Sequence, residues 1–200
     1  MKGLPIDFTS FRDDAAVKYA AKHAGESGLG FIGNVHVKHT RGDKILHDAW
    51  EPEHNTFTTE GMAYLLNIIF GATSKAAAAI WYVGIFKSDV TPAVGDTIAA
   101  KLGASGTYGE CQDADYDDPA TNKPAYTIAT TTTAVCTNSA SKATFVMAAS
   151  ITVYGAFLSD AAAKTATSGH LMCAKRFAAS RAVIADDELA VTYQITCTTS

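Results

Sequence analysis

The stretch LAVTYQITC at residues 189–197, close to the end of the chain, alternates between two kinds of side chain. Apolar residues occupy every second position, and small or polar residues separate them. Successive side chains of a β-strand point to opposite faces of the sheet, so this alternation predicts a strand with one face against a core. The predicted core face carries Leu189, Val191, Tyr193, Ile195 and Cys197.

The same period of two occurs earlier in the chain. From Phe31, Val35 and Val37 alternate with polar residues, and the turn Arg41-Gly42-Asp43 leads into residues 45–50, which predicts a hairpin. We interpret Arg41-Gly42-Asp43 as ordinary turn chemistry rather than as an adhesion motif. Apolar or Thr-rich runs bounded by turn residues predict further strands near residues 80–86, 126–137, 142–147, 151–158 and 171–177.

One helix is predicted in the body of the chain, over residues 59–70. Thr58 and Thr59 are N-cap candidates, the apolar residues have helical spacing, and Gly71 follows the end. About eight strands with few strand–helix–strand units favour a mainly β fold, an antiparallel β-sandwich that is most simply jelly-roll-like. Residues 31–200 form a single domain in this interpretation, and residues 95–124 are expected to form loops across one end of it.

Residues 1–30 are predicted to be an N-terminal arm with a short helix. Ser10 can cap this helix and Gly25 can end it, but its apolar face is too thin to form a core alone. Apolar side chains without a local core bury themselves against partners. The arm residues expected to contact a partner are Leu4, Pro5, Phe8, Phe11 and Tyr19.

The 200 residues, 48% hydrophobic and 18% charged, have the composition of a globular domain. The 16 Lys and Arg residues are scattered and the formal net charge is -4, so no nucleic-acid partner is expected. No apolar run approaches the roughly 18 residues of a membrane-spanning helix, so no membrane partner is expected. Residues 1–30 lack the charged-then-apolar order of a signal peptide, and the chain is expected to fold in a cytoplasm.

Two groups of potential metal ligands are present, and the first consists of four histidines. His36 and His39 differ in strand parity and point to opposite faces, so we interpret the group as solvent-facing or interface residues. A metal site that includes a nearby carboxylate is the alternative. The histidines are His36, His39, His47 and His54, and the carboxylates are those of Asp48, Glu51 and Glu53.

The second group is the acidic segment at residues 113–118. It resembles the start of a calcium-binding loop, but Asp118 stands where that loop requires Gly, and Pro124 stands where it requires Glu. We interpret the segment as a solvated acidic loop, with an irregular Ca²⁺ or Mg²⁺ site as the alternative. The acidic turn at residues 186–188 is likewise expected to be a solvated connection.

No motif points to catalysis. Residues 28–33 match G-x-G-x-x-G, but a strand follows where dinucleotide binding requires a helix. Residues 139–142 match S-x-x-K without the partner motifs of serine acyl transferases. We therefore expect a protein that is not an enzyme and has no cofactor, no metal and no catalytic residue.

Trp81 and Tyr82 are interpreted as core residues. The widely spaced cysteines are expected to be reduced thiols, with two disulfides as the alternative, and are Cys111, Cys136, Cys173 and Cys197.

Packing and turn motifs over most of residues 55–197 resemble those of the jelly-roll cement or decoration proteins of tailed-bacteriophage heads. The residues that carry the resemblance are Thr58-Thr59-Glu60-Gly61 leading into Leu65-Leu66, Trp81-Tyr82-Val83-Gly84-Ile85, Asp96-Thr97-Ile98-Ala99, Gly155-Ala156-Phe157-Leu158, Phe177 with Arg181 and Val183, and residues 187–193.

This resemblance implies a virion protein, assembled in the host cytoplasm, that binds the outside of the phage head. It implies two partners: the major capsid protein, whose lattice it stabilises by bridging subunits, and itself, as a homotrimer. Terminal segments such as the arm would grip neighbouring subunits. The alternatives are a phage tail or fibre component that contacts the host surface, and an enzyme or metal-dependent carbohydrate binder.

Overall fold

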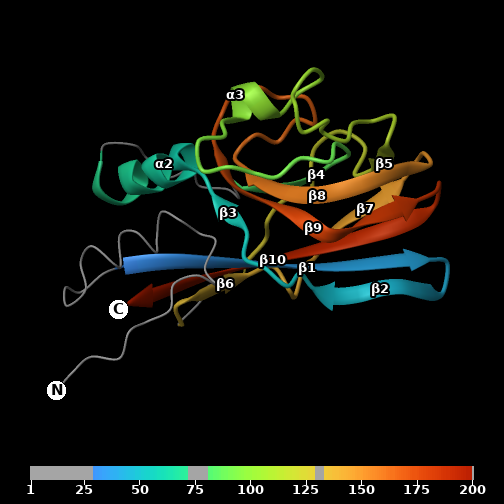
Figure 1. The fold of residues 1–200 in the computed structure, drawn as a ribbon, viewed down its shortest axis with the longest axis horizontal. Helices are drawn as coiled ribbons and strands as arrows, with labels where there is room; N and C mark the ends of the chain where they lie inside the picture. Colours follow the sequence, from blue (N-terminus) through green and yellow to red (C-terminus); the bar gives the residue numbers. More distant parts are fainter. Residues whose placement is uncertain (1–28, 72–80, 129–132, 200) are drawn as a thin grey trace.

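The computed structural model describes residues 29–71, 81–128 and 133–199 (Figure 1). These residues form two antiparallel β-sheets, two helices and a layer of loops. The elements in chain order are β1 (Leu29–Arg41), β2 (Lys44–Trp50), β3 (Thr56–Phe57), α2 (Thr59–Phe70), β4 (Tyr82–Phe86), α3 (Ile98–Lys101), β5 (Tyr116–Asp118), β6 (Val135–Thr137), β7 (Ala143–Met147), β8 (Ile151–Ser159), β9 (Leu171–Val183) and β10 (Asp187–Thr199).

The larger sheet, sheet A, has the strand order β2-β1-β10-β7-β5, with β6 beside β10. Sheet B has the order β3-β9-β8-β4. The first and last strands pair over their whole length, from Leu29 opposite Thr199 to Arg41 opposite Asp187. The predicted mainly β, antiparallel sandwich is confirmed, and so is the helix at residues 59–70.

The main core lies between the two sheets. β10 contributes Leu189, Val191 and Tyr193, all without exposed surface, and these belong to the face that the alternation predicts. β1 contributes Val35 and Val37 in the same way. Burying such side chains stabilises the fold by about 1.5–3 kcal/mol each, so the paired strands β1 and β10 both contribute to the stability of this core.

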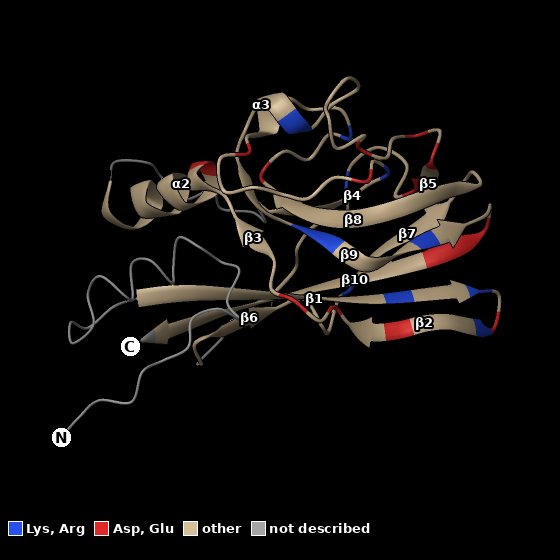
Figure 2. Cartoon of the chain, in the orientation of Figure 1, with Lys and Arg blue, Asp and Glu red and all other residues tan. Residues whose placement is uncertain are grey.

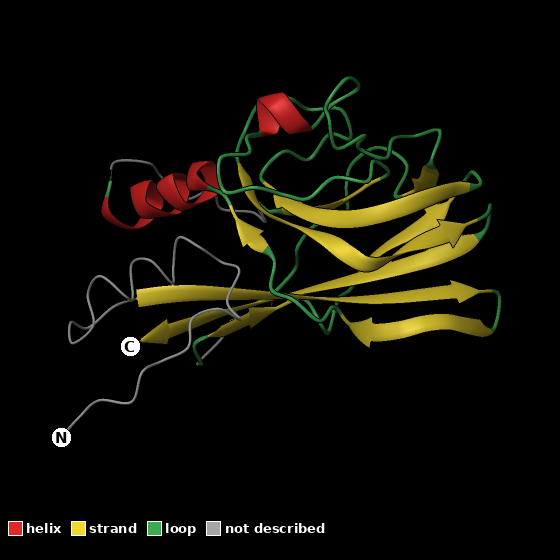
Figure 3. Cartoon of the chain, viewed as in Figure 1, coloured by secondary structure: helices red, strands yellow, loops and turns green. Residues whose placement is uncertain are grey.

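Sheet B is buried on both faces. Most of the segment at residues 87–124, called here the loop layer, covers its outer face and forms a second core with it (Figure 3), whereas β5 within the same segment belongs to sheet A. The loops expected across one end of the fold therefore cover a sheet face instead. Two buried faces explain why β4 is apolar at consecutive positions. The buried residues of this second core are Phe86, Ile98, Leu102, Tyr108, Phe157, Ala161, Leu171 and Ala174.

The segment at residues 126–137, predicted as one long strand, crosses between the sheets instead. Ala125 makes a bridge to Tyr82 in sheet B, whereas Val135 pairs with Thr196 in sheet A. Only Val135–Thr137 is a strand within the described part of this segment. A Thr-rich composition favours extended backbone but does not specify which sheet receives it.

The turn before β10 differs from the prediction at one residue. Asp187 has no exposed surface, whereas its neighbours Asp186 and Glu188 are exposed. Arg41 donates two hydrogen bonds of 2.8 Å to the Asp187 carboxylate, and His39 Nε2 lies 2.9 Å from it. The expectation of a solvated connection is therefore wrong for Asp187, because the tip of the β1–β2 hairpin folds over this carboxylate.

Other local predictions are confirmed. The predicted turn lies between β1 and β2: Arg41 ends β1, Gly42 and Asp43 form the turn, and Gly42 adopts a φ of 53°, which glycine tolerates best. Cys111, Cys136, Cys173 and Cys197 are all free thiols. Neither helix in the described part of the chain is long and apolar enough to cross a membrane.

Candidate interaction surface

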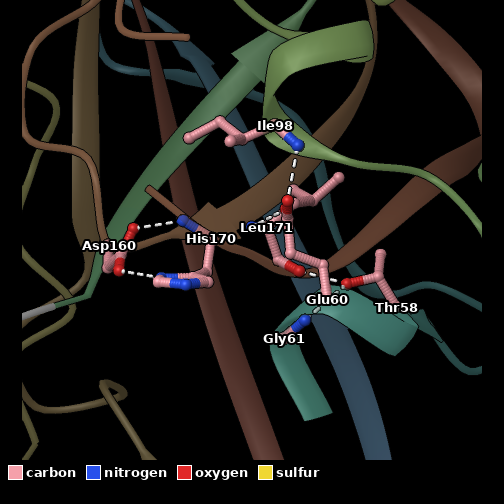
Figure 4. A network of polar contacts seen from close by, with 7 residues as sticks. All are labelled: Thr58, Glu60, Gly61, Ile98, Asp160, His170 and Leu171. Atoms are coloured by element: carbon pink, nitrogen blue, oxygen red, sulfur yellow. Dashed lines mark hydrogen bonds and ion pairs between the residues drawn. The ribbon is translucent and has the colours of Figure 1, made fainter. Parts of the chain in front are cut away.

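Helix α2 is fastened to sheet B at its first turn (Figure 4). The Thr58 hydroxyl accepts a hydrogen bond of 3.0 Å from the Gly61 N–H and donates one to the Leu171 carbonyl oxygen. Thr58 has no exposed surface, so the same hydroxyl caps the helix and binds it to β9. Thr58 is thus the N-cap, and Thr59, the other candidate, is the first helical residue.

The Glu60 carboxylate adds a second attachment. Its Oε2 atom accepts hydrogen bonds from two backbone N–H groups, that of Ile98 at 2.9 Å and that of Leu171 at 2.7 Å (Figure 4). Ile98 begins α3 and Leu171 begins β9. One carboxylate therefore connects α2, the loop layer and sheet B, and bonds to a charged acceptor are about twice as strong as neutral ones.

Aromatic rings hold the next turn of the helix. The Tyr64 ring stacks on the His170 ring with 4.0 Å between centroids, and the Trp81 ring meets Tyr64 edge-on at 5.8 Å. His170 Nδ1 lies 2.7 Å from Asp160 Oδ2, and the His170 N–H donates to Asp160 Oδ1 at 2.5 Å. Asp160 thereby sets the orientation of the imidazole, which in turn supports Tyr64.

Trp81 also packs against the main core, as predicted for it, and Tyr82 is half-buried.

Beyond these attachments, one end of the molecule carries no charged side chain among the residues that the structure describes. We call this region the uncharged end and define it as residues 29–35, 61–71, 135–137 and 193–199. Figure 2 shows Lys, Arg, Asp and Glu on the β1–β2 hairpin and the loop layer, whereas α2 is uncoloured after its first turn.

Large apolar side chains are exposed at the uncharged end. The exposed fraction is 52% for Leu66, 54% for Ile69, 81% for Phe70 and 61% for Leu29. Nearer the start of the same helix, Met62 and Leu65 pack against the main core. The last two turns of the helix are therefore uncharged all round and, apart from the exposed Asn67, carry apolar or aromatic side chains, a pattern typical of helices that are buried on more than one side. The arrangement provides a rigid apolar surface that is suited to contact with protein.

The Thr58 hydroxyl is expected to matter for stability. Thr58→Val keeps the shape of the side chain but removes the cap of α2 and the bond to β9. We expect the free energy of unfolding to fall by about 1–2 kcal/mol, measured by urea denaturation. Thr58→Ser retains the hydroxyl and serves as the control, with most of the stability preserved. A valine variant as stable as the serine variant would contradict the capping role.

The candidate site residues of the arm, Leu4, Pro5, Phe8, Phe11 and Tyr19, lie outside the described residues. The first residue of β1 lies at the uncharged end, so residues 1–28, which include the predicted arm, connect to the described part of the chain there. The structure therefore brings the attachment point of the arm to the same end as Leu66, Ile69 and Phe70.

His36 and His39 lie on different faces of β1, as predicted, and His47 lies on β2 opposite His39. His54 is exposed between β2 and β3, with its Nδ1 atom 2.7 Å from Asn34 Oδ1. His36 contacts Asp48 at 3.1 Å, and its ring meets the Trp50 ring edge-on. His39 is buried beside Asp187 of the same chain, so the expectation of a solvent-facing or interface residue is wrong for it. Burial lowers the pKa of both His36 and His47.

The acidic segment is held by lysines. Lys87 binds the Asp115 carboxylate at 2.6 Å, and Lys164 binds that of Asp113 at 2.9 Å. Asp115 is buried, so the expected solvated loop is only partly correct. Within the described ranges, no three His, Cys, Asp or Glu side chains are grouped so that they could hold a metal ion.

The exposed apolar surface of α2 was not among the predicted contact residues. The signal for it is present in the sequence, because residues 61–71 contain no charged residue while apolar residues occupy both sides of the predicted helix.

Comparison of the chain with protein-family models, with curated proteins and with solved structures finds no match.

Proposed function

We propose that this chain is a structural protein of a tailed-bacteriophage virion, a capsid decoration protein that forms homotrimers. In this proposal it binds the outside of the head and stabilises the major capsid lattice by bridging subunits. The observation that carries the proposal is the uncharged end, where Leu66, Ile69 and Phe70 lie exposed on a helix that is fixed to a rigid sandwich.

We assign this surface to contact between copies of the chain. Permanent interfaces between identical subunits are more apolar than transient ones and contain few charges, as the uncharged end does. Because the arm joins the domain at this end, association there would gather three arms at one place. Leu4, Pro5, Phe8, Phe11 and Tyr19 would then contact the capsid. Several modest contacts held on one trimer bind tightly together without any single tight site.

The function is tested by the amount of the chain in phage particles. Particles purified by sedimentation from an infected or induced lysate are analysed by quantitative mass spectrometry. We expect a ratio to the major capsid protein near one to one, because a protein that bridges the lattice must be present at every lattice position. A ratio of a few per hundred, or absence from particles, contradicts a decoration role.

The self-association surface is tested by the double variant Leu66→Ser and Phe70→Ser. Both side chains are exposed, so we expect the free energy of unfolding to change by less than about 0.5 kcal/mol per site. We expect the trimer of the original chain to become a monomer in sedimentation velocity experiments, because the apolar contact is lost.

The matched control is Ile45→Ser with Leu46→Ser in β2. These residues are 54% and 39% exposed but lie in the β1–β2 hairpin, away from the uncharged end. We expect this variant to remain a trimer. A monomeric original chain, or equal dissociation of both variants, contradicts the assignment.

A second candidate function is that of a tail or fibre component that contacts the host surface, and one observation favours it. Asn34, Trp50 and Gln194 line a shallow hollow of about 200 Å³ on sheet A, and Trp50 is 49% exposed. Sugar rings stack on exposed aromatic rings while amide side chains bond their hydroxyls. Binding of host polysaccharide that Trp50→Ala abolishes, together with a low copy number per particle, would support this candidate over the first.

A further inference from the structure

Glu110 and Lys123 form an ion pair inside the loop layer. Lys123 Nζ lies 2.9 Å from Glu110 Oε1, and the two side chains are 0% and 1% exposed for lysine and glutamate. In every other lysine–carboxylate pair among the described residues, at least one side chain has substantial exposed surface, as Lys87 (42%) and Asp113 (79%) do. The Glu110–Lys123 pair is therefore distinguished by complete burial of both partners.

The remaining polar atoms of the pair are also held in place. The Gly103 N–H donates a hydrogen bond of 2.8 Å to Glu110 Oε2, and Lys123 Nζ donates one of 2.5 Å to the Ala163 carbonyl oxygen. The Lys123 backbone N–H donates to the Ala162 carbonyl oxygen at 2.8 Å, which fixes the base of the side chain. Nζ also lies 5.8 Å from the centre of the Phe157 ring.

This environment disfavours both charges. Burial raises the pKa of the Glu110 carboxyl and lowers the pKa of the Lys123 ammonium. A proton that moves from the ammonium to the carboxylate produces a neutral amine beside a neutral carboxylic acid, and the desolvated site favours that transfer. These are the forms in which an amine nitrogen can attack a carboxyl carbon.

We propose that Lys123 and Glu110 are joined by an isopeptide bond. Nζ attacks the carboxyl carbon Cδ, the Nζ–Cδ bond forms, and the Cδ–Oε1 bond breaks. Oε1 leaves as water with two of the three ammonium protons, and the third proton remains on the amide nitrogen. The step needs no oxidant, reductant or second substrate.

The contacts of the pair match the requirements of this step. Cδ lies one bond beyond Oε1, so Nζ is near the separation of about 3–3.5 Å at which reacting atoms meet. The Gly103 N–H points at Oε2, the oxygen on which negative charge develops during the attack. The Ala163 carbonyl binds an Nζ proton and so orients the nitrogen.

The product would keep the same two hydrogen bonds. Oε2 becomes the amide oxygen and still accepts from Gly103, while the amide N–H still donates to Ala163. A buried ion pair is thereby replaced by a neutral amide with both polar groups satisfied, which removes the desolvation cost of two charges. The bond would close the loop of residues 111–122 covalently. This inference is independent of the proposed virion function.

The test is the mass of the purified full-length chain under denaturing conditions. We expect the original chain to be lighter than its sequence mass by one water molecule. The control is Lys123→Arg, which keeps a cation beside Glu110 but removes the nucleophilic amine, and it should have its full sequence mass. An original chain of full sequence mass overturns the proposal, whether or not the arginine variant folds.

The position of the bond is tested by digestion. Trypsin does not cleave before Pro124, so Glu110 and Lys123 remain in one tryptic peptide, and chymotrypsin then cuts after Tyr116 between them. We expect the two resulting peptides to stay joined. Their fragment masses in tandem mass spectrometry should place the linkage between Glu110 and Lys123. Two separate peptides, or a loss of water located at any other residue, would overturn the assignment.

Discussion

Gly61→Ala is expected to lower the free energy of unfolding by about 2–3 kcal/mol, the cost of forcing a methyl group into a packed contact. A Cβ atom on Gly61 would lie 2.4 Å from Met172 Cα and 2.7 Å from the Leu171 carbonyl oxygen. Both are backbone atoms of β9, which pairs with β3 and β8 and cannot move away without breaking sheet B. The gain of about 1 kcal/mol from replacing a helical glycine by alanine is smaller than this cost.

Urea unfolding of the Gly61→Ala chain measures the effect. Gly95→Ala is the matched control, because no atom lies within 4 Å of its added Cβ. The control is expected to have the same stability as the original chain, or to gain a few tenths of a kcal/mol. If both variants unfolded at the same urea concentration, the close approach of α2 to β9 would not be a feature of the folded protein.

Asp187→Asn is expected to cost about 3 kcal/mol, because it removes the negative charge from a buried group of partners. The Asp187 side chain has no exposed surface and accepts hydrogen bonds from Arg41 and from the Ile184 N–H, the latter at 3.0 Å. Arg41 is 43% exposed and can regain water, which places the cost at the lower end of the range for buried ion pairs.

The Asp187 carboxylate is also expected to make the free energy of unfolding depend on pH. Hydrogen bonds from Arg41 hold the pKa of Asp187 far below its ordinary value of 3.8. A group whose pKa is depressed by folding contributes its full stability above the unfolded pKa and loses it as the pH falls toward the folded pKa. The stability difference between the original chain and Asp187→Asn should therefore be constant above pH 5 or so and shrink below about pH 4.

Unfolding experiments across this pH range measure the effect. Asp186→Asn removes the same charge from an exposed neighbour, and Asn tolerates the φ of 66° found there. We expect this control to follow the original chain at every pH. A constant difference between the original chain and Asp187→Asn down to the lowest pH would show that the carboxylate charge does not stabilise the fold.

The secondary structure was largely predictable because it depends on local patterns. The alternation in β10 and β1 and the cap at Thr58 place these two strands and helix α2 within a few residues of their observed bounds, whereas β3, α3 and β5 were not predicted. The segment at residues 126–137 was predicted less well, since its Thr-rich sequence favours extended backbone in either sheet. The loop layer was also missed as a layer, because Ile98 and Leu102 belong to a helix of a single turn and Tyr108 lies outside any helix or strand, so the pattern is too short to mark a second core.

The sequence alone determined the class of the fold. Period-two alternation is sufficient to predict sheets, and the absence of charge in residues 61–71 is visible without coordinates. Tertiary structure decided what depends on distant partners: the burial of Asp187 under Arg41, the meeting of Glu110 with Lys123, and the exposure of Phe70. Pairing of residues far apart in the chain specifies these environments, and no local pattern records which side chain a distant segment will cover.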